Sequence, residues 1–211
     1  MRRWWSRTLI GLVVLLLATL VAVVVGAGTL LRKSLPPLDG RVVARGLGAP
    51  ATLERDARGS VTLTGSTRAD LAYALGYAHA QDRWFQMDLL RRAAAGELSA
   101  LLGPATLDAD RDLRVHRFRA VAREALAAAP AADRAIVAAY ARGANAGLAS
   151  LGTRPWEYWL LRTAPEPWRA EDSLLVIFAM FVDLQLGDQR HERQRGLFAD
   201  TLPPAVARFL Y

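Results

Sequence analysis

The stretch Gly76–Gly103 constrains the fold most, because it has the pattern of an amphipathic helix but carries an acidic residue on its apolar face. Apolar side chains recur at the spacing of one helical face, at Leu71, Leu75, Ala78, Phe85 and Leu89. Asp82 comes four residues after Ala78, so it falls on the same face. A carboxylate buried there costs free energy unless it is paired. The sequence therefore predicts a long helix whose Asp82 forms a buried ion pair with an arginine.

Three arginines of the same stretch are candidate partners for this carboxylate, namely Arg83, Arg91 and Arg92. An arginine elsewhere in the chain is the alternative. We interpret Asp82 and these arginines as structural residues that tie the helix to its neighbours. Two further residues, Asn145 and Trp168, are also predicted to have packing or loop-fixing roles.

An uncharged apolar run, Leu9–Leu31, predicts a helix that crosses a membrane. Its 23 residues exceed the roughly 20 that span a bilayer and the roughly 7–15 of a signal-peptide core. We expect residues 1–33 to be an uncleaved signal anchor with a cytoplasmic N-terminus, while the small residues at 26–28 leave cleavage open. The rest of the chain is then periplasmic and tied to the inner membrane.

The formal net charge of +7 does not predict a nucleic-acid partner. The first 33 residues contain no acidic residue, and basic residues flank the apolar run at Arg2, Arg3, Arg7, Arg32 and Lys33. Most of the positive charge is therefore a membrane-flank effect, and no basic stripe with interleaved aromatic residues follows. The chain contains no cysteine, which excludes a thiol nucleophile, a cysteine-ligated zinc site and disulfides.

The sequence after the apolar run is predicted to be a linker, residues 34–50, whose first part, Ser34–Gly40, is a stiff spacer with Pro36-Pro37. A folded and mostly helical region, residues 51–211, follows. Thr67–Asp70 fits a capping box at the start of the long helix, and Gly103-Pro104 fits its end. Two short β-branched runs predict a hairpin or two successive strands, at Ala51–Asp56 and Ser60–Thr64. The other helices are expected at Asp108–Ala129, Asp133–Ala149 and Glu171–Gly187, with a loop at Thr153–Trp168.

Common catalytic motifs are missing from this sequence. It contains no Gly-x-Ser-x-Gly elbow, no P-loop and no His-Glu-x-x-His motif. The three histidines, His79, His116 and His191, are scattered along the chain, and we interpret them as structural or surface residues. The residues alone therefore do not predict a complete catalytic site.

A series of motifs between about residue 50 and residue 195 occurs in a fixed order: Arg55-Asp56, Gly76-Tyr-Ala-His-Ala-Gln-Asp-Arg83, Gln86-Met-Asp88, Arg91-Arg92, Gly96, Leu102-Gly103, Tyr140-Ala-Arg-Gly143-Ala-Asn145, Pro155-Trp-Glu157-Tyr, Pro165-Glu-Pro167-Trp168 and Glu171-Asp172-Ser173. In this order the motifs resemble the N-terminal part of the penicillin acylase family. A single motif would be weak, whereas the whole series in register is specific.

The resemblance implies an α+β fold, the αββα fold of N-terminal-nucleophile hydrolases. Members of the family are exported precursors that cut themselves into a smaller α chain, a spacer and a larger β chain. The present chain corresponds to the mostly helical α-chain portion, with one or two short N-terminal strands. We therefore expect residues 51–211 to form an incomplete domain whose partner is the β chain of the same precursor.

The resemblance also implies the reaction, which is hydrolysis of a linear amide bond between an acyl group and an amine. The nucleophile is a serine at the β-chain N-terminus, followed by asparagine, and its own α-amino group acts as the base. No serine of this chain is followed by asparagine. We therefore expect no catalytic residue here and no activity of the chain alone. The alternatives are a non-catalytic, membrane-tethered helical domain and a truncated gene fragment.

Substrate-binding residues are implied by the same resemblance in the segment Ser173–Gly187, which lines the acyl pocket in the family. Met180 matches a pocket methionine, and Leu184 and Asp183 lie where penicillin G enzymes carry phenylalanine and arginine. Met180 and Leu184 are four residues apart and share a helical face, which suits an apolar acyl group. The two differences point to another acyl group, and the alternative is that both apolar residues belong to the core.

A calcium ligand is the last expectation from the resemblance, because the family's calcium site takes one glutamate from the α chain and its other oxygens from the β chain. Glu192 is the candidate, and Asp188 is the rival because the alignment is ambiguous at this point. Calcium needs about 6–8 oxygen ligands, so one glutamate cannot make a site. The alternative for both residues is a solvated charge on a helix. No organic cofactor is expected.

Overall fold

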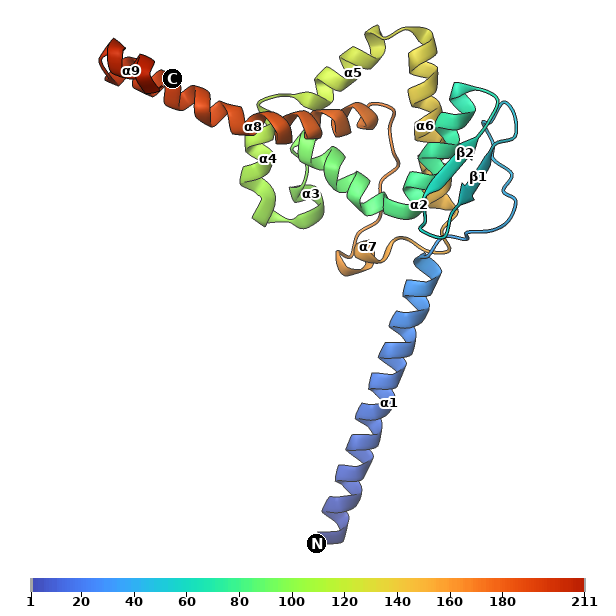
Figure 1. Ribbon diagram of the computed structural model, residues 1–211. Helices are drawn as coiled ribbons and strands as arrows, with labels where there is room; N and C mark the ends of the chain where they lie inside the picture. The colour runs from blue at the N-terminus through green and yellow to red at the C-terminus, as the bar shows by residue number, and fades with distance from the viewer. Residues whose placement is uncertain (1, 211) are drawn as a thin grey trace. The chain divides into compact units, whose positions relative to one another are not determined.

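The computed structural model describes the backbone of residues 2–210 and the side chains of residues 11–185 and 191–209. The chain divides into two compact units. The first contains Met1–Phe85 and Arg142–Pro167, and the second contains Gln86–Ala141 and Trp168–Tyr211. Within the described residues the elements are helices apart from one two-stranded sheet, as the α-chain portion of the predicted fold requires (Figure 1).

Helix α1 (Arg2–Ser34) opens the first unit. Within its segment Gly11–Ser34, an 18-residue stretch has a mean hydropathy of 2.7, and none of that stretch is buried. By length and composition this helix is able to cross a membrane, and a signal sequence near an N-terminus has the same properties. The predicted apolar helix is therefore present.

The sheet of the first unit is a hairpin of β1 (Thr52–Arg55) and β2 (Val61–Thr64), which pair antiparallel with Leu53 opposite Leu63. In the turn, Asp56 Oδ1 accepts hydrogen bonds from the backbone N–H groups of Arg58 and Ser60, both at 2.8 Å. An acidic side chain that closes a turn in this way explains why the strands end where they do. Of the two arrangements predicted for these runs, the hairpin is the one that forms.

Helix α2 (Arg68–Ala95) begins at the predicted capping box. The backbone N–H of Asp70 donates to Thr67 Oγ1 at 3.1 Å, and the Thr67 hydroxyl donates to the Asp70 carboxylate at 2.7 Å. Asp70 also accepts a hydrogen bond from the N–H of Gly48 at 2.7 Å. This reciprocal pairing satisfies donors that a helix start leaves free, which is why the helix begins here.

The predicted buried face of α2 is wrong. Leu75 and Asp82 are exposed, whereas Ala78 is buried as predicted, and the other buried apolar residues before Arg83 are Tyr73, Ala74 and Ala80. The backbone leaves helical geometry at Arg83, with φ −152° and ψ 36°. A continuous period of 3.6 residues cannot pass through such a kink, so the apolar positions before and after Arg83 do not form one stripe.

Helix α6 (Ala131–Ala149) lies against the first part of α2, and glycines allow the close approach. A Cβ atom at Gly143 would lie 1.9 Å from the carbonyl oxygen of Tyr73, and one at Gly147 would lie 2.4 Å from that of Tyr77. Any side chain at these positions would overlap the backbone of α2, because such contacts need more than 3 Å. The two glycines therefore set the helix spacing in the first unit.

Two further sequence predictions fail in the second unit. The long helix ends at Ala95 rather than at Gly103-Pro104, because Gly96 adopts a left-handed φ of +67°. The single helix expected at Asp108–Ala129 is two helices, α4 (Leu107–Arg114) and α5 (Phe118–Ala128), separated by Arg117 at φ +52°. The short α3 (Ser99–Leu102) and a 3-10 turn, Pro104–Thr106, complete this region.

Helix α8 (Asp172–Thr201) follows the predicted helix start and continues well past Gly187, and α9 (Pro204–Leu210) comes after it. The core of the second unit forms around Ala94, Ala122 and Leu175, where α2, α5 and α8 meet. Phe118 and Phe178 stack against this core with ring centroids 5.0 Å apart. Packing of this kind fixes which face of α8 turns inward.

Candidate functional site

The outward face of α8 is apolar, although it faces solvent in the structure. Ile177, Met180, Phe181 and Leu184 recur at helical spacing, and between 56 and 67% of each side chain is exposed. Contiguous apolar patches of this kind on a folded domain mark a surface that something else covers or binds. The face of α8 opposite the core is therefore the candidate functional site.

Met180 and Leu184, two of the predicted substrate-binding residues, lie on this face. Neither belongs to the core formed by the described residues, which was the alternative interpretation. Asp183, the third, is also exposed and lies at the edge of the apolar face, one position before Leu184. The roles of these three residues in substrate binding stay predictions.

A buried ion-pair network holds the start of α8. The carboxylate of Asp172 is fully buried and accepts from Arg91 Nη1 at 2.6 Å, Arg119 Nη1 at 2.9 Å and the backbone N–H of Arg169 at 2.8 Å. Charge-assisted bonds at these distances are the strong ones, and together they satisfy the acceptor capacity of a buried carboxylate. The first turn of α8 is therefore fixed to the end of α2 and to α5.

The network continues from both arginines. Arg91 and Arg92 each donate from Nε to the buried Asp88 Oδ1, at 2.7 and 2.9 Å. Arg119 contacts the carboxylate of Glu97 with two nitrogens, both at 2.6 Å. Burial alone would lower the pKa of Arg119, but the hydrogen bonds that its guanidinium donates to Glu97 and Asp172 raise this pKa above its usual value.

The structure places the predicted structural residues in two groups. Arg91, Arg92 and Trp168 belong to the network, because the Arg91 guanidinium lies 5.1 Å above the indole ring of Trp168. The indole N–H of Trp168 donates to the hydroxyl of Ser173 at 3.1 Å. These contacts agree with a packing and loop-fixing role for Trp168.

Asp82 does form an ion pair, but the pair is not buried. Its partner is Arg55 at the end of β1, at 2.8 Å, with 29% of the Asp82 side chain exposed. Arg83 lies at the kink of α2 and is exposed. Asp88, six residues further on, is fully buried, and Asp70 in the first turn of α2 is also buried. A pair as open as Arg55–Asp82 contributes about 0.2–1 kcal/mol.

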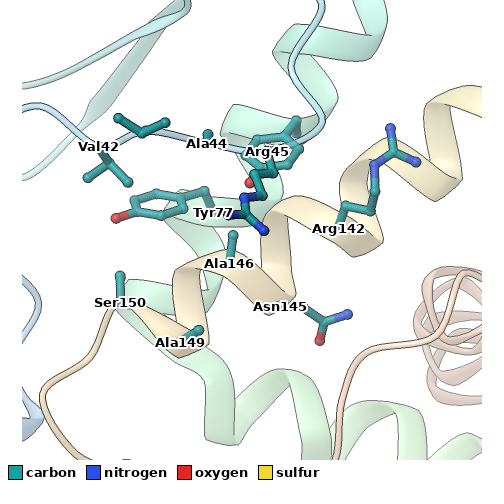
Figure 2. A pocket seen from close by; sticks show the side chains of 11 residues that line it. Val42, Ala44, Arg45, Tyr77, Arg142, Asn145, Ala146, Ala149 and Ser150 are labelled. Carbon is teal, nitrogen blue, oxygen red and sulfur yellow. The ribbon is translucent and has the colours of Figure 1, made fainter.

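A hollow of about 490 Å³ in the first unit is lined by α2, α6 and residues 42–45 (Figure 2). Asn145 and Ser150 are among its lining residues. The Ser150 hydroxyl donates to the carbonyl of Gly147 at 2.7 Å and accepts from Gln81 at 3.3 Å. A hydroxyl held in this way caps the end of α6 and has the bonding of a structural residue, not of a nucleophile.

The predicted calcium ligand does not make a metal site with its neighbours. Glu192 is exposed and pairs with Arg195 at 3.3 Å, and the side chain of Asp188 lies outside the described residues. Among the described residues, no group of three or more histidine, aspartate and glutamate side chains is close enough to hold a metal ion. The oxygens of this region alone therefore do not fit calcium.

The carboxylate of Asp110 in α4 fixes the start of α3 through two hydrogen bonds. Its Oδ1 accepts from the backbone N–H of Leu98 at 2.8 Å and its Oδ2 from that of Ser99 at 2.7 Å. Burial would raise the pKa of Asp110, but the hydrogen bonds from Ser99 and Leu98 hold it below 3.8. Asp110 therefore stabilises the fold in its ionised form.

We expect D110N to lower the free energy of unfolding by about 1–2 kcal/mol at neutral pH, because the amide replaces one of two charged acceptors. A lowered pKa means that the contribution of Asp110 is present above its ordinary value of 3.8 and is lost as the pH falls through the folded-state value. Urea unfolding followed by circular dichroism at several pH values checks this. A difference between the two proteins that stays constant down to acid pH would contradict it.

Sequence reasoning missed four members of the network, Asp88, Glu97, Arg119 and Asp172. Asp88 and Asp172 lie within motifs that identified the resemblance, but nothing local marks them as partners. Arg91 and Asp172 are 81 positions apart in the chain, and Arg119 and Asp172 are 53 apart. Only the packing of α2, α5 and α8 brings them together.

Together, a mostly helical chain with one short hairpin and an apolar helix face open to a partner define the α-chain-like part of a larger hydrolase. The model of the penicillin amidase family matches residues 50–211. The chain therefore belongs to the penicillin amidase family, and its fold is that of the α-chain portion of an N-terminal-nucleophile hydrolase.

Curated relatives name the activities found in this family. The chain is 41% identical over 147 residues to penicillin acylase 2 proenzyme of Pseudomonas sp. strain SE83, covering 70% of this chain and 19% of that protein. It is 36% identical over 157 residues to the acyl-homoserine lactone acylase QuiP of Pseudomonas aeruginosa, covering 72% and 18%. The chain thus spans about a fifth of the length of these relatives.

A solved structure has the same fold. Thermostable penicillin G acylase from Alcaligenes faecalis superposes with a TM-score of 0.64 at 28% sequence identity, covering 76% of this chain and 88% of the matched chain. At this level of identity and coverage the likeness extends over most of both chains.

Proposed function

We propose that this chain is the α-chain part of an acylase that hydrolyses the amide bond between an acyl group and an amine. The observation that carries the proposal is the match over residues 50–211 to a family whose curated relatives are acylases. The relatives include a penicillin acylase and an acyl-homoserine lactone acylase, so the shared chemistry is amide hydrolysis rather than one substrate.

The shares of the relatives that this chain covers support an α chain that is separate from the rest of the enzyme. The region covers a fifth of a relative named as a proenzyme, but 88% of the matched chain in the solved acylase. A polypeptide of similar extent is therefore a chain of its own in that structure. The partner we propose is the downstream region of the same precursor.

The nucleophile in this proposal is a serine of the downstream region. Its hydroxyl attacks the amide carbonyl while its own α-amino group accepts the proton. The C–N bond then breaks, the amine leaves with that proton, and water hydrolyses the resulting acyl-enzyme to release the acid and the free serine. Ser150 and Ser173 of this chain engage in structural hydrogen bonds. The 211-residue chain alone is proposed to be inactive.

The outward face of α8 is the contribution of this chain to substrate binding. Met180 and Leu184 form an apolar wall for the acyl group, since apolar pockets recognise acyl chains by the area they bury. Asp183 lies at the rim, where its charge selects against an anionic acyl group. The network around Asp172 holds the wall in place at the start of α8.

The site of action we propose is the periplasm, with α1 as the inner-membrane anchor. Support comes from the length of the apolar helix and the basic residues that flank it. We also propose that Glu192 supplies one calcium ligand, with Asp188 as the rival, and that the remaining oxygens come from the downstream region.

Co-expression tests the proposed function. The chain and its downstream region are produced together, and hydrolysis is measured on chromogenic acyl amides of increasing chain length. Activity is expected for the pair, and none for the chain alone or for a pair whose downstream N-terminal serine is replaced by alanine. Hydrolysis by the chain alone, or by the serine variant, would contradict the proposal.

We expect L184A to shift the preferred acyl group of the assembled enzyme towards longer chains, because the smaller side chain leaves room at the wall. Each methylene of mismatch is worth about 1–3 kcal/mol in kcat/KM. L197A is the matched control, since Leu197 is an equally exposed leucine of the same helix outside the proposed wall. An acyl-length profile that L184A and L197A leave equally unchanged would show that Leu184 does not contact the acyl group.

A further inference from the structure

Helix α7 (Trp156–Leu160) carries large apolar side chains on its solvent side. The exposed fractions are 46% for Trp156, 42% for Trp159 and 72% for Leu160. The opposite side holds Tyr158, which is fully buried and packs edge-on against Phe85 with ring centroids 5.6 Å apart. The buried tyrosine fixes the rotation of this short helix, so the two tryptophans are held outward.

This outward face lies beside the end of α1. Helices α1 and α7 are in contact within the first unit, and Figure 1 draws α7 next to the end of α1. A Cβ atom at Gly152, just before α7, would lie 3.0 Å from the carbonyl oxygen of Lys33. Gly152, four residues before α7, therefore lies next to Lys33, the last charged residue of α1.

The depth of Lys33 follows from the apolar run. Leu9–Leu31 is uncharged and long enough to fill the hydrocarbon layer, so Arg32 and Lys33 mark the level of the headgroups. Tryptophan is the side chain that prefers this level, because its ring is apolar and its N–H needs a polar partner.

The side chains around α7 carry a net positive charge, which favours contact with a membrane surface. Arg154 comes before the helix, with its guanidinium 3.9 Å from the ring centre of Trp159, and Arg162 follows it and is exposed. With Arg32 and Lys33 these residues outnumber Glu157, the one acidic residue of α7. Basic residues at this level are attracted to anionic headgroups.

We propose that the outward face of α7 is a membrane-interface contact: Trp156, Trp159 and Leu160 insert at the headgroup level of the bilayer that α1 crosses. The contact seats the first unit on the membrane surface through a second attachment point besides α1. The proposal concerns lipid and does not depend on the acylase activity, but it requires α1 to remain as a membrane-spanning helix.

Single labels on the full chain in phosphatidylcholine vesicles with a minority of phosphatidylglycerol test this. The chain has no cysteine, so L160C carries one environment-sensitive fluorophore and leaves both tryptophans in place. We expect lipid with a spin label near its headgroup to quench this fluorophore, and aqueous iodide to quench it weakly. R68C is the control, because Arg68 is exposed at the start of α2, drawn well away from the end of α1 in Figure 1. Aqueous iodide is expected to quench the fluorophore at R68C, and the spin-labelled lipid is expected to quench it only weakly.

Two further variants make the outcome decisive. L160C combined with W156S and W159S is expected to lose most of the quenching by lipid and to become accessible to iodide. A fluorophore at L20C in α1 reports membrane insertion, because lipid that carries a spin label near the middle of its acyl chain should quench it. Absence of this quenching would overturn the proposal. The proposal would also be overturned if the fluorophore at L160C responded like the one at R68C. A fluorophore at L160C that is shielded from iodide but not quenched by lipid would overturn it as well, because protein would then cover α7.

Discussion

Replacement of Asp172 by alanine is expected to destabilise the second unit by about 3–5 kcal/mol, the cost of breaking a buried ion pair. The carboxylate is fully buried and accepts from two arginines and one backbone N–H at 2.6–2.9 Å. Without it, the buried Arg91 and the partly buried Arg119 share too little negative charge, and the start of α8 loses its attachment. Urea unfolding followed by circular dichroism measures the loss.

An exposed pair in the same unit provides the control. Asp108 and Arg111 lie 2.9 Å apart, but 93% and 68% of their side chains are exposed. Such pairs contribute about 0–1 kcal/mol, so D108A is expected to change little. If D172A unfolds at the same urea concentration as D108A, the network around Asp172 does not hold α8.

The second large effect is expected for G143A, which we predict to lower the free energy of unfolding by about 3 kcal/mol or more. The new Cβ would lie 1.9 Å from the carbonyl oxygen of Tyr73, so α6 would have to move away from α2. Backbone atoms cannot give way as the end of a side chain can. The same unfolding measurement reports the cost.

G196A is the control, and its expected effect on the free energy of unfolding is zero or of opposite sign. Gly196 lies inside α8 and has open space around it, with nothing within 4 Å of a Cβ atom. Alanine favours a helix over glycine by about 0.5–1 kcal/mol, so G196A is expected to be neutral or stabilising. Equal effects of G143A and G196A would contradict the close approach of α6 and α2.

Local features were predictable from the sequence because their partners are near in the chain. The capping box of Thr67 and Asp70 spans three residues, and the hairpin closes around Asp56 within four. The apolar run of α1 needs no partner at all. In each case the residue types alone fix the conformation.

The breaks in the helices were not predictable, because neither Arg83 nor Arg117 is a residue type that usually interrupts a helix. Tertiary packing overrides propensity at both positions. The break at Arg83 separates Phe85 and Leu89 from the apolar positions before it, but Asp82 precedes the break. Asp82 pairs with Arg55, 27 positions earlier in the chain, a partner that helical spacing does not reveal. Two of the buried carboxylates pair with arginines: Asp88 with Arg91 and Arg92 on its own helix, and Asp172 with arginines that folding brings to it.

The candidate site itself came from family resemblance rather than from spacing. Met180 and Leu184 have the pattern of core residues, and an apolar pair four positions apart on a helix usually is core. Their exposure in the structure is the observation that spacing alone does not predict. A helix face that is covered by a partner chain would have the same sequence pattern as a core face, because both are shielded from water.

The most direct test of the central claim, that α8 supplies the acyl-binding wall of an acylase, is the reactivity of a thiol introduced by M180C. The chain has no cysteine, so mass spectrometry of this chain reports one site. In the assembly with the downstream region, a saturating concentration of the acyl-acid product is expected to slow alkylation at this position. Alkylation of Q185C, on the adjoining exposed surface of α8, should not change. Equal alkylation of M180C with and without the product would contradict the claim.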